Sequence, residues 1–175
     1  MMILKMQDDQ DLEKLFDDAA YLQDELTALK LVISAVPHSE KPLGQESIKE
    51  MIMLIDHAQT TYYSPVISHI FSEAKPVLND IDNFNTTFSP LSEENDLKPD
   101  EIINMTIKNR TALLDKLKQM PEEDLQRTAL LKGNETSIAE LLNEMIGFER
   151  NKLKEIAERV LIIDAGRSAP KPPQT

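Results

Sequence analysis

The chain has 175 residues, no cysteine and a formal net charge of −12 at pH 7. This length suits one domain with a single core, and the lack of cysteine excludes disulfides, thiolate nucleophiles and zinc ribbons. The acidic charge disfavours binding to nucleic acid or to an anionic membrane surface, and the composition, 41% hydrophobic with only 4 glycines, favours an all-α protein.

The first predicted helix has apolar residues every three or four positions from Leu12 to Val36, which places them on one face. We expect this helix to run from about Asp9 to Val36, and the prolines and glycine between 37 and 44 to end it. The N-terminus turns acidic too early for a signal peptide, and no apolar run reaches the about 18 residues that span a bilayer. We therefore expect a cytoplasmic protein.

A serine-isoleucine-x-glutamate phrase occurs twice, at 47–50 and at 137–140. In each copy the serine oxygen can accept from the backbone N–H three residues on, while the glutamate reaches back to the serine N–H. Each copy therefore predicts the start of a helix, the second and the fourth of the chain. We expect Pro65 to kink or end the second helix, because its ring removes a donor and clashes with the preceding turn.

A long connection is predicted from Glu73 to Lys98, where the helical periodicity fades. We expect no strand in it and one short helix, formed by Val77, Leu78 and Ile81. A connection of this length can return the chain to the end of the bundle where helix two began, so that the next helix runs parallel to helix two.

The remaining elements are marked by proline and glycine. We expect helix three from Pro99 to about Met120, a short acidic turn at 121–125, a break at Gly133, and helix four ending near Gly166. The tail at 168–175 has three prolines and is expected to be disordered. The predicted domain therefore covers residues 1–167.

Three segments in this order resemble the DinB-like superfamily of four-helix bundles. They are the capping phrase at 47–50, the run from Arg110 to Leu125, and the stretch from Gly133 to Ile156, with its glycine and threonine before helix four. The resemblance covers nearly the whole chain. It implies an all-α four-helix bundle of up-down-down-up topology, with the long connection between helices two and three, and commonly a homodimer.

Many proteins of that superfamily hold a divalent metal with three histidines, and the resemblance carries these positions to Leu54, Phe148 and Lys152. Leucine and phenylalanine offer no lone pair, and lysine is protonated near pH 7. We therefore predict no metal and no other cofactor. Leu54 and Phe148 should pack near one another, and Lys152 should turn toward the open end of the bundle or toward Glu149, the glutamate that the resemblance retains.

A relocated metal site is the alternative. His57 lies about one helical turn after Leu54, beside Asp56, and could approach Glu149 or Glu144. One histidine with carboxylates could then serve a metal-dependent thiol transferase or a hydrolase-type enzyme. A lone histidine flanked by acids on a helix is more often exposed or hydrogen-bonded.

The sequence indicates no catalytic residue, because it lacks a glycine-rich phosphate loop, a nucleophile elbow and an HExxH motif. The leading prediction is a non-catalytic role in ligand binding or protein interaction, by a homodimer that binds neither nucleic acid nor membrane. A purely structural dimer is a further alternative. The candidate pocket, which could take a small-molecule ligand, lies at the former metal position and consists of Leu54, Phe148, Glu149, Lys152, His57 and Tyr62.

Overall fold

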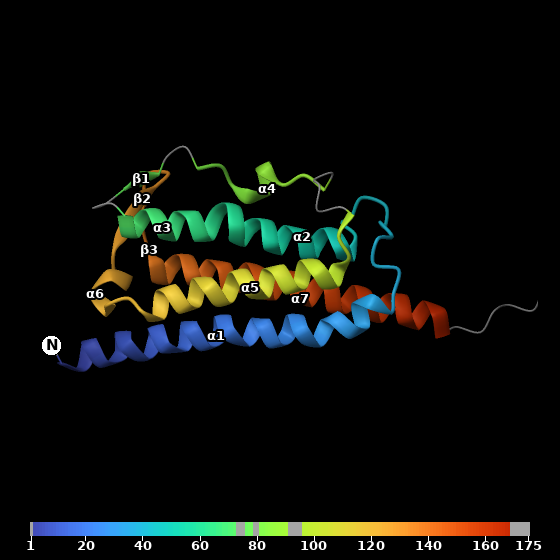
Figure 1. Ribbon diagram of the computed structural model, residues 1–175, viewed down its shortest axis with the longest axis horizontal. Helices are drawn as coiled ribbons and strands as arrows, with labels where there is room; N and C mark the ends of the chain where they lie inside the picture. The colour runs from blue at the N-terminus through green and yellow to red at the C-terminus, as the bar shows by residue number, and fades with distance from the viewer. Residues whose placement is uncertain (1, 73–75, 79–80, 91–95, 169–175) are drawn as a thin grey trace, which may run out of the picture.

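The computed structural model describes residues 2–72, 76–78, 81–90 and 96–168 (Figure 1). Four long helical segments dominate this part of the chain: α1 (Met2–Ser34), α2 (Ile48–Ala58) continued by the π-helical turn η1 (Gln59–Tyr63) and α3 (Ser64–Ser72), α5 (Pro99–Lys118), and α7 (Ile138–Ser168). The helix starting at Met2 is longer than predicted, and α7 continues two residues beyond Gly166. Apart from Ser168, the predicted disordered tail lies outside the described residues.

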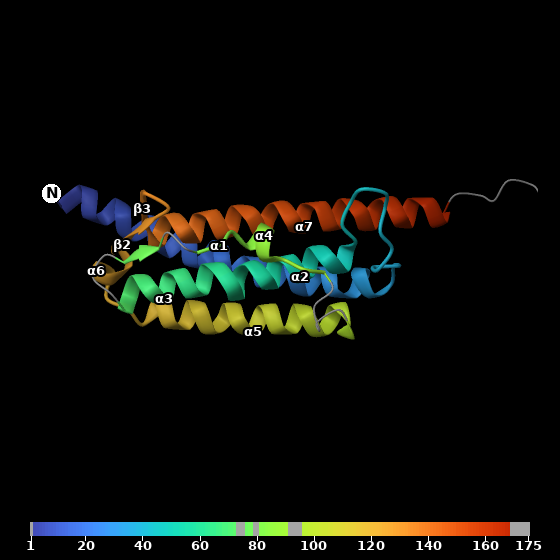
Figure 2. The same cartoon turned by 90° about the horizontal axis from the view of Figure 1, so that it is seen from above.

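The four segments form an up-down-down-up bundle, as Figures 1 and 2 show. The helices α1 and α7 run in one direction, while α2–α3 and α5 run together in the other. Both α1 and α2 pack against α5 and α7, so α1 lies diagonally across the bundle from α2. This confirms the predicted all-α bundle with parallel second and third helices. No helix of the described residues is long and apolar enough to cross a membrane.

The core consists of apolar side chains from all four segments. The stripe predicted for α1 is inside, with Ala19, Leu22 and Ile33 fully buried. The α2 side chains from Ile48 to Ile55 are almost all buried. Full burial of one aliphatic side chain is worth about 1.5–3 kcal/mol, so the packing of these faces stabilises the bundle.

Both predicted capping phrases form the expected hydrogen bonds. The Glu50 N–H donates to Ser47 Oγ at 3.1 Å, and the Ser47 N–H donates to Glu50 Oε2 at 2.7 Å. The corresponding distances for Ser137 and Glu140 are 3.2 and 2.7 Å. Each pair satisfies two backbone donors at a helix start, which fixes where α2 and α7 begin.

The connection from 73 to 98 differs from the prediction. Val77–Leu78 forms a short strand, β1, and not a helix, while the short helix α4 lies at Phe84–Thr87. The strand β1 pairs in parallel with β2 (Thr128–Leu131), which pairs antiparallel with β3 (Asn134–Ser137). The expectation of a strand-free connection is therefore wrong, although the direction of the helices on either side is as predicted.

The break predicted at Gly133 is the turn of the hairpin between β2 and β3. Lys132 and Gly133 both have positive φ angles, of 49° and 84°. Two consecutive residues of this conformation make the tight turn that matches the twist of a two-stranded hairpin. The short acidic helix α6 (Glu122–Leu125) lies where the acidic turn was predicted.

The helix that begins after Ser47 does not end at Pro65, because α3 continues it to Ser72. The wide turn η1 lies directly before this proline, and the Ser64 N–H donates to the Gln59 carbonyl five residues back. Within the turn, the hydroxyls of Thr60 and Thr61 donate to backbone carbonyls of the preceding turn, at 2.8 and 2.7 Å. These hydroxyls supply hydrogen-bond donors to the backbone where the regular helical hydrogen bonds are interrupted.

Candidate functional site

The three positions to which the resemblance carries histidines have different surroundings. Leu54 lies on α2 with 3% of its surface exposed, as part of the hydrophobic core. Phe148 lies on α7, half-buried, with its ring centroid 4.8 Å from that of Phe84. Lys152 lies one turn further along α7, and its Nζ donates to Glu46 at 2.9 Å and to Glu155 at 3.0 Å. None of these side chains offers a metal a ligand in this arrangement.

Phe84, from the short helix α4, fills the space beside Phe148. Its ring also lies 5.6 Å from Tyr62 and 5.7 Å from Tyr63, in tilted arrangements. Both tyrosines come from the wide turn η1 and both are buried. The Tyr63 hydroxyl donates to Glu144 at 3.2 Å, and burial, with Glu144 nearby, raises the pKa of that hydroxyl. These four rings form an aromatic cluster at the predicted pocket.

Glu149 belongs to a second group, the Arg110 network, in the middle of the bundle. Arg110, on α5, is 1% exposed and donates from Nε to Gln59 Oε1 at 2.7 Å and from Nη1 to the Ala19 carbonyl at 3.3 Å. Its Nη2 forms a hydrogen-bonded ion pair with Glu149 of α7. One guanidinium therefore joins all four helical segments. Glu149 is paired with Arg110, so of the two orientations expected for Lys152, the one toward Glu149 is not found.

Burial dominates the electrostatics of this network. It raises the pKa of the Glu149 carboxyl, although the Arg110 guanidinium opposes the rise. Glu149 Oε1 is buried without a hydrogen-bond partner among the described residues. Asp56 is 2% exposed, and burial raises the pKa of its carboxyl as well, although Asn109 donates to it at 3.4 Å. The fully enclosed ion pair of Arg110 and Glu149 holds the helices in one geometry and leaves no access for a substrate.

The residues proposed for a relocated metal site do not converge. His57 Nε2 lies 2.9 Å from Thr87 Oγ1, and its ring lies 5.6 Å from that of Phe88. The two candidate glutamates bind Arg110 and Tyr63 instead. In the part of the chain that the structure describes, no three histidine, cysteine or acidic side chains are placed to hold a metal ion.

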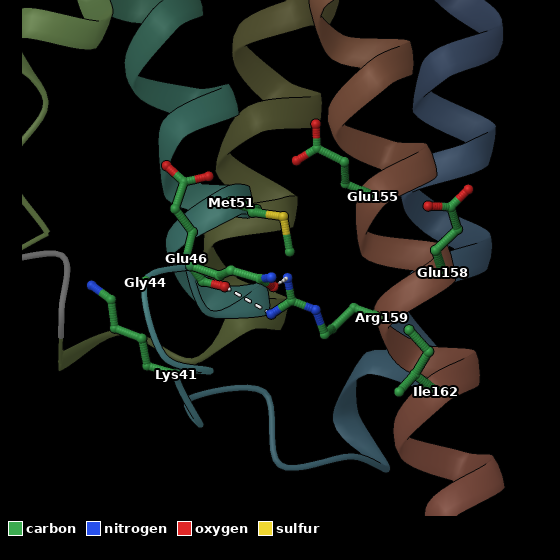
Figure 3. A pocket seen from close by; sticks show the side chains of 9 residues that line it. Lys41, Gly44, Glu46, Met51, Glu155, Glu158, Arg159 and Ile162 are labelled. Carbon is green, nitrogen blue, oxygen red and sulfur yellow. Dashed lines mark hydrogen bonds between the residues drawn. The ribbon is translucent and has the colours of Figure 1, made fainter.

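An open pocket of about 780 Å³ lies next to Lys152, between the loop that follows α1 and the second half of α7 (Figure 3). Its wall contains both carboxylates that bind Lys152. On α7, Arg159 reaches across and donates to the Glu46 carbonyl at 3.0 Å and to Gln45 Oε1 at 2.6 Å. The lining consists of Lys41, Gly44, Gln45, Glu46, Met51, Glu155, Glu158, Arg159 and Ile162.

Lys152 and its partners stabilise the edge of this pocket. Burial alone would lower the pKa of the Lys152 ammonium, but the hydrogen bonds to Glu46 and Glu155 outweigh it and raise that pKa. The lysine is therefore charged at neutral pH. It links the loop after α1 to α7. This link lies between the aromatic cluster in the core and the open pocket.

No family model matches the chain, and no curated protein matches its sequence. Among solved structures, the fold is similar to that of YfiT from Bacillus subtilis, with a TM-score of 0.70 over 84% of this chain and 86% of that chain. The two proteins share a fold. YfiT is described as a probable metal-dependent hydrolase with an unusual four-helix bundle topology. The sequence identity is 9%, so the likeness concerns the fold and not the chemistry.

Of the six predicted pocket residues, the structure places Phe148 and Tyr62 in the aromatic cluster and Leu54 in the core. His57 lies on α2 with its ring against Thr87 and Phe88, and Glu149 lies in the Arg110 network. Lys152 forms ion pairs with two residues of the open pocket, Glu46 and Glu155. Whether any of the six contacts a ligand stays a prediction. Sequence reasoning missed Arg110, Phe84 and Arg159. An arginine within the apolar stripe of helix three was a signal for the first, while the other two depend on the path of loops.

Proposed function

We propose that this protein is a non-catalytic binding protein whose small-molecule ligand enters the open pocket between the loop after α1 and α7. The observation that carries the proposal is the position of Lys152, where the resemblance places a metal-binding histidine. Its ammonium binds Glu46 and Glu155, and both of these line the pocket. A fixed ion pair thus stands next to a large accessible space.

The residues present do not fit the metal centre that the fold similarity suggests. A leucine in the core, a phenyl ring against Phe84 and a charged lysine stand at the three positions. Glu149, the acid that the resemblance retains, is already paired with Arg110. We therefore infer that binding, and not metal-assisted chemistry, is the function.

A metal titration tests this part of the proposal. We expect the natural protein to show no submicromolar affinity for zinc or nickel in isothermal calorimetry. The triple variant Leu54→His, Phe148→His, Lys152→His should gain divalent-metal affinity, because histidines four apart on α7 share a face and can chelate one ion. Submicromolar binding by the unchanged chain would contradict the proposal.

A pair of neighbouring variants tests the pocket. Leu161 and Ile162 are both 69% exposed, but only Ile162 is part of the pocket lining. A library of small polar and amphiphilic compounds should include ligands that shift the methyl resonances of Met51 and Ile162 in NMR spectra. Ile162→Arg should abolish ligand binding without lowering the melting temperature, whereas Leu161→Arg should leave binding unchanged. If no compound shifts these resonances, the binding proposal is wrong.

We also propose that the protein is a homodimer, formed through the groove of about 420 Å³ between α1 and α7. The groove is lined by Glu25 on α1 and by Arg150 and Lys154 on α7, around the apolar residues Ala28, Leu29, Leu153 and Ala157. These helices run in parallel, so a twofold axis along them would place the acidic side of one copy against the basic side of the other.

Light scattering at micromolar concentration should give about twice the 19.9 kDa chain mass. Lys154→Glu should shift the protein toward monomer, because it places like charges opposite each other across the groove. A natural protein with the mass of a single chain would overturn the dimer and leave the binding pocket unaffected.

A further inference from the structure

The open pocket has two oppositely charged walls on one face of α7. Glu155 and Arg159 are four residues apart, a spacing at which a glutamate and a basic residue on a helix often pair with each other. Here each is bound to something else: Glu155 Oε2 accepts from Lys152, and Arg159 donates to the loop. The two opposite charges are therefore held apart across the pocket (Figure 3).

The bonds of Arg159 go to neutral oxygens, the backbone carbonyl of Glu46 and the side-chain amide of Gln45. Guanidinium has five N–H donors in a fixed plane and keeps its charge at all accessible pH values. These bonds orient the group without supplying a negative charge to it. A carboxylate is the partner that best matches such a guanidinium, because two N–H donors can bind its two oxygens.

The wall of the pocket that contains Glu155 and Glu158 is acidic. Glu155 is 51% exposed, and Glu158 is 61% exposed with its carboxylate 3.9 Å from the Lys154 ammonium. At this exposure the pairs with lysine are weak, so both carboxylates can accept a further donor. An ammonium group fits here, whereas a second anionic group would be repelled. The acidic wall therefore selects against ligands that are only anionic.

Met51 lies between the two walls, as Figure 3 shows, and Ile162 lies at the edge of the pocket beyond Arg159. Met51 is 1% exposed and forms the back of the pocket, while Ile162 is 69% exposed and can still bury apolar surface on binding. A flexible methionine adapts to apolar groups of different shape. The pocket therefore offers an apolar surface next to separated positive and negative groups.

Resting on the proposed binding function, we propose that the ligand is a free α-amino acid with an apolar side chain. Its carboxylate binds Arg159, its ammonium binds Glu155 and Glu158, and its side chain lies against Met51 and Ile162. An α-amino acid carries both charges on one carbon, so it can bind a carboxylate and a guanidinium whose residues are four apart on one helix, about 6 Å along the helix axis.

Three related probes test the assignment in isothermal calorimetry with the full chain: L-leucine, N-acetyl-L-leucine without the ammonium, and L-leucinamide without the carboxylate. We expect leucine to bind at least tenfold more tightly than either of the other two. Equal binding of the three would show an apolar site only, and tighter binding of N-acetyl-leucine would show an anion site. Either result, or no leucine binding at 10 mM, overturns the amino-acid assignment.

Variants separate this inference from the general proposal. Arg159→Met should weaken leucine binding at least tenfold and leave leucinamide binding unchanged. Glu155→Gln should also weaken leucine binding but leave N-acetyl-leucine binding unchanged. Arg127→Met is the matched control, because Arg127 is a partly exposed arginine paired with Asp124, outside the pocket lining. If other compounds bind at Met51 but leucine does not, the binding function stands and the amino-acid class is wrong.

Discussion

The Arg110 network and the open pocket use the same chemical groups in opposite ways. In the network, a guanidinium, a carboxylate and an amide are enclosed by four helices, and Arg110 is 1% exposed. At the pocket, Lys152 beside the lining is 18% exposed, and its partner Glu155 in the lining is 51% exposed. Burial, more than residue type, therefore decides whether a charged group stabilises the fold or remains accessible to a ligand.

The largest effect should come from removing the cation of the enclosed network. Arg110→Met leaves the Glu149 carboxylate buried without its partner, which should lower the free energy of unfolding by about 3–5 kcal/mol. Urea denaturation at pH 7 measures this. The double variant Arg110→Met, Glu149→Leu removes both charges and should recover most of the loss. A single variant as stable as the natural protein would show that the network contributes little.

The aromatic cluster should come next. Phe84→Ala removes a ring that is 4% exposed and contacts three other rings, so about 3–4 kcal/mol should be lost through cavity formation. Phe148→Ala should cost less, because Phe148 is only half-buried. Thermal and urea denaturation of both variants give the ranking. The reverse order would mean that Phe148, and not Phe84, contributes more to the packing of the aromatic cluster.

The exposed pair should matter much less to stability. Lys152→Met breaks the contacts with Glu46 and Glu155, and partly exposed ion pairs are worth about 1 kcal/mol or less. We expect a small drop in melting temperature that shrinks further at high salt. A loss as large as that of Arg110→Met would mean that the loop after α1 depends on this lysine and would remove the contrast between the two regions.

The smallest effect concerns Asp56, beside the network. Burial raises the pKa of its carboxyl above the ordinary 3.8, so between these two pKa values the folded state holds more protons than the unfolded state. Stability due to this group therefore falls as pH rises through the raised pKa. Asp56→Asn should be more stable than the natural protein at pH 7, with the gain vanishing below the ordinary pKa. Melting curves from pH 3 to pH 8 measure this, and a constant difference would contradict it.

The sequence predicted the bundle well because its signals are local. Apolar periodicity placed the faces of the helices, and the serine and glutamate of each capping phrase placed the starts of α2 and α7. The length of the connection from 73 to 98, together with the resemblance, predicted the direction of helix three. Strand β1 could not be predicted in this way, since a two-residue strand at Val77 exists only through its pairing with β2.

The site was harder to predict than the fold. Lys152, Phe148 and Leu54 were singled out from the resemblance, but their partners come from segments distant in the chain. Phe84 reaches the aromatic cluster from a loop with no regular spacing, and Arg159 reaches Gln45 across 114 residues of sequence. Long-range contacts of this kind depend on the path of loops, which local propensity does not determine.

The π-helical turn before Pro65 has the form of a one-residue insertion that the helix absorbs. A turn closed over five residues contains one residue more than a regular one, so the helix after it keeps the phase it would have without the extra residue. Deleting Thr60, which is exposed, should therefore restore a regular helix and leave Val66 and Ile70 facing the core. What would be lost is the local bulge that lets two successive tyrosines both point inward. The aromatic cluster thus depends on a single surplus residue.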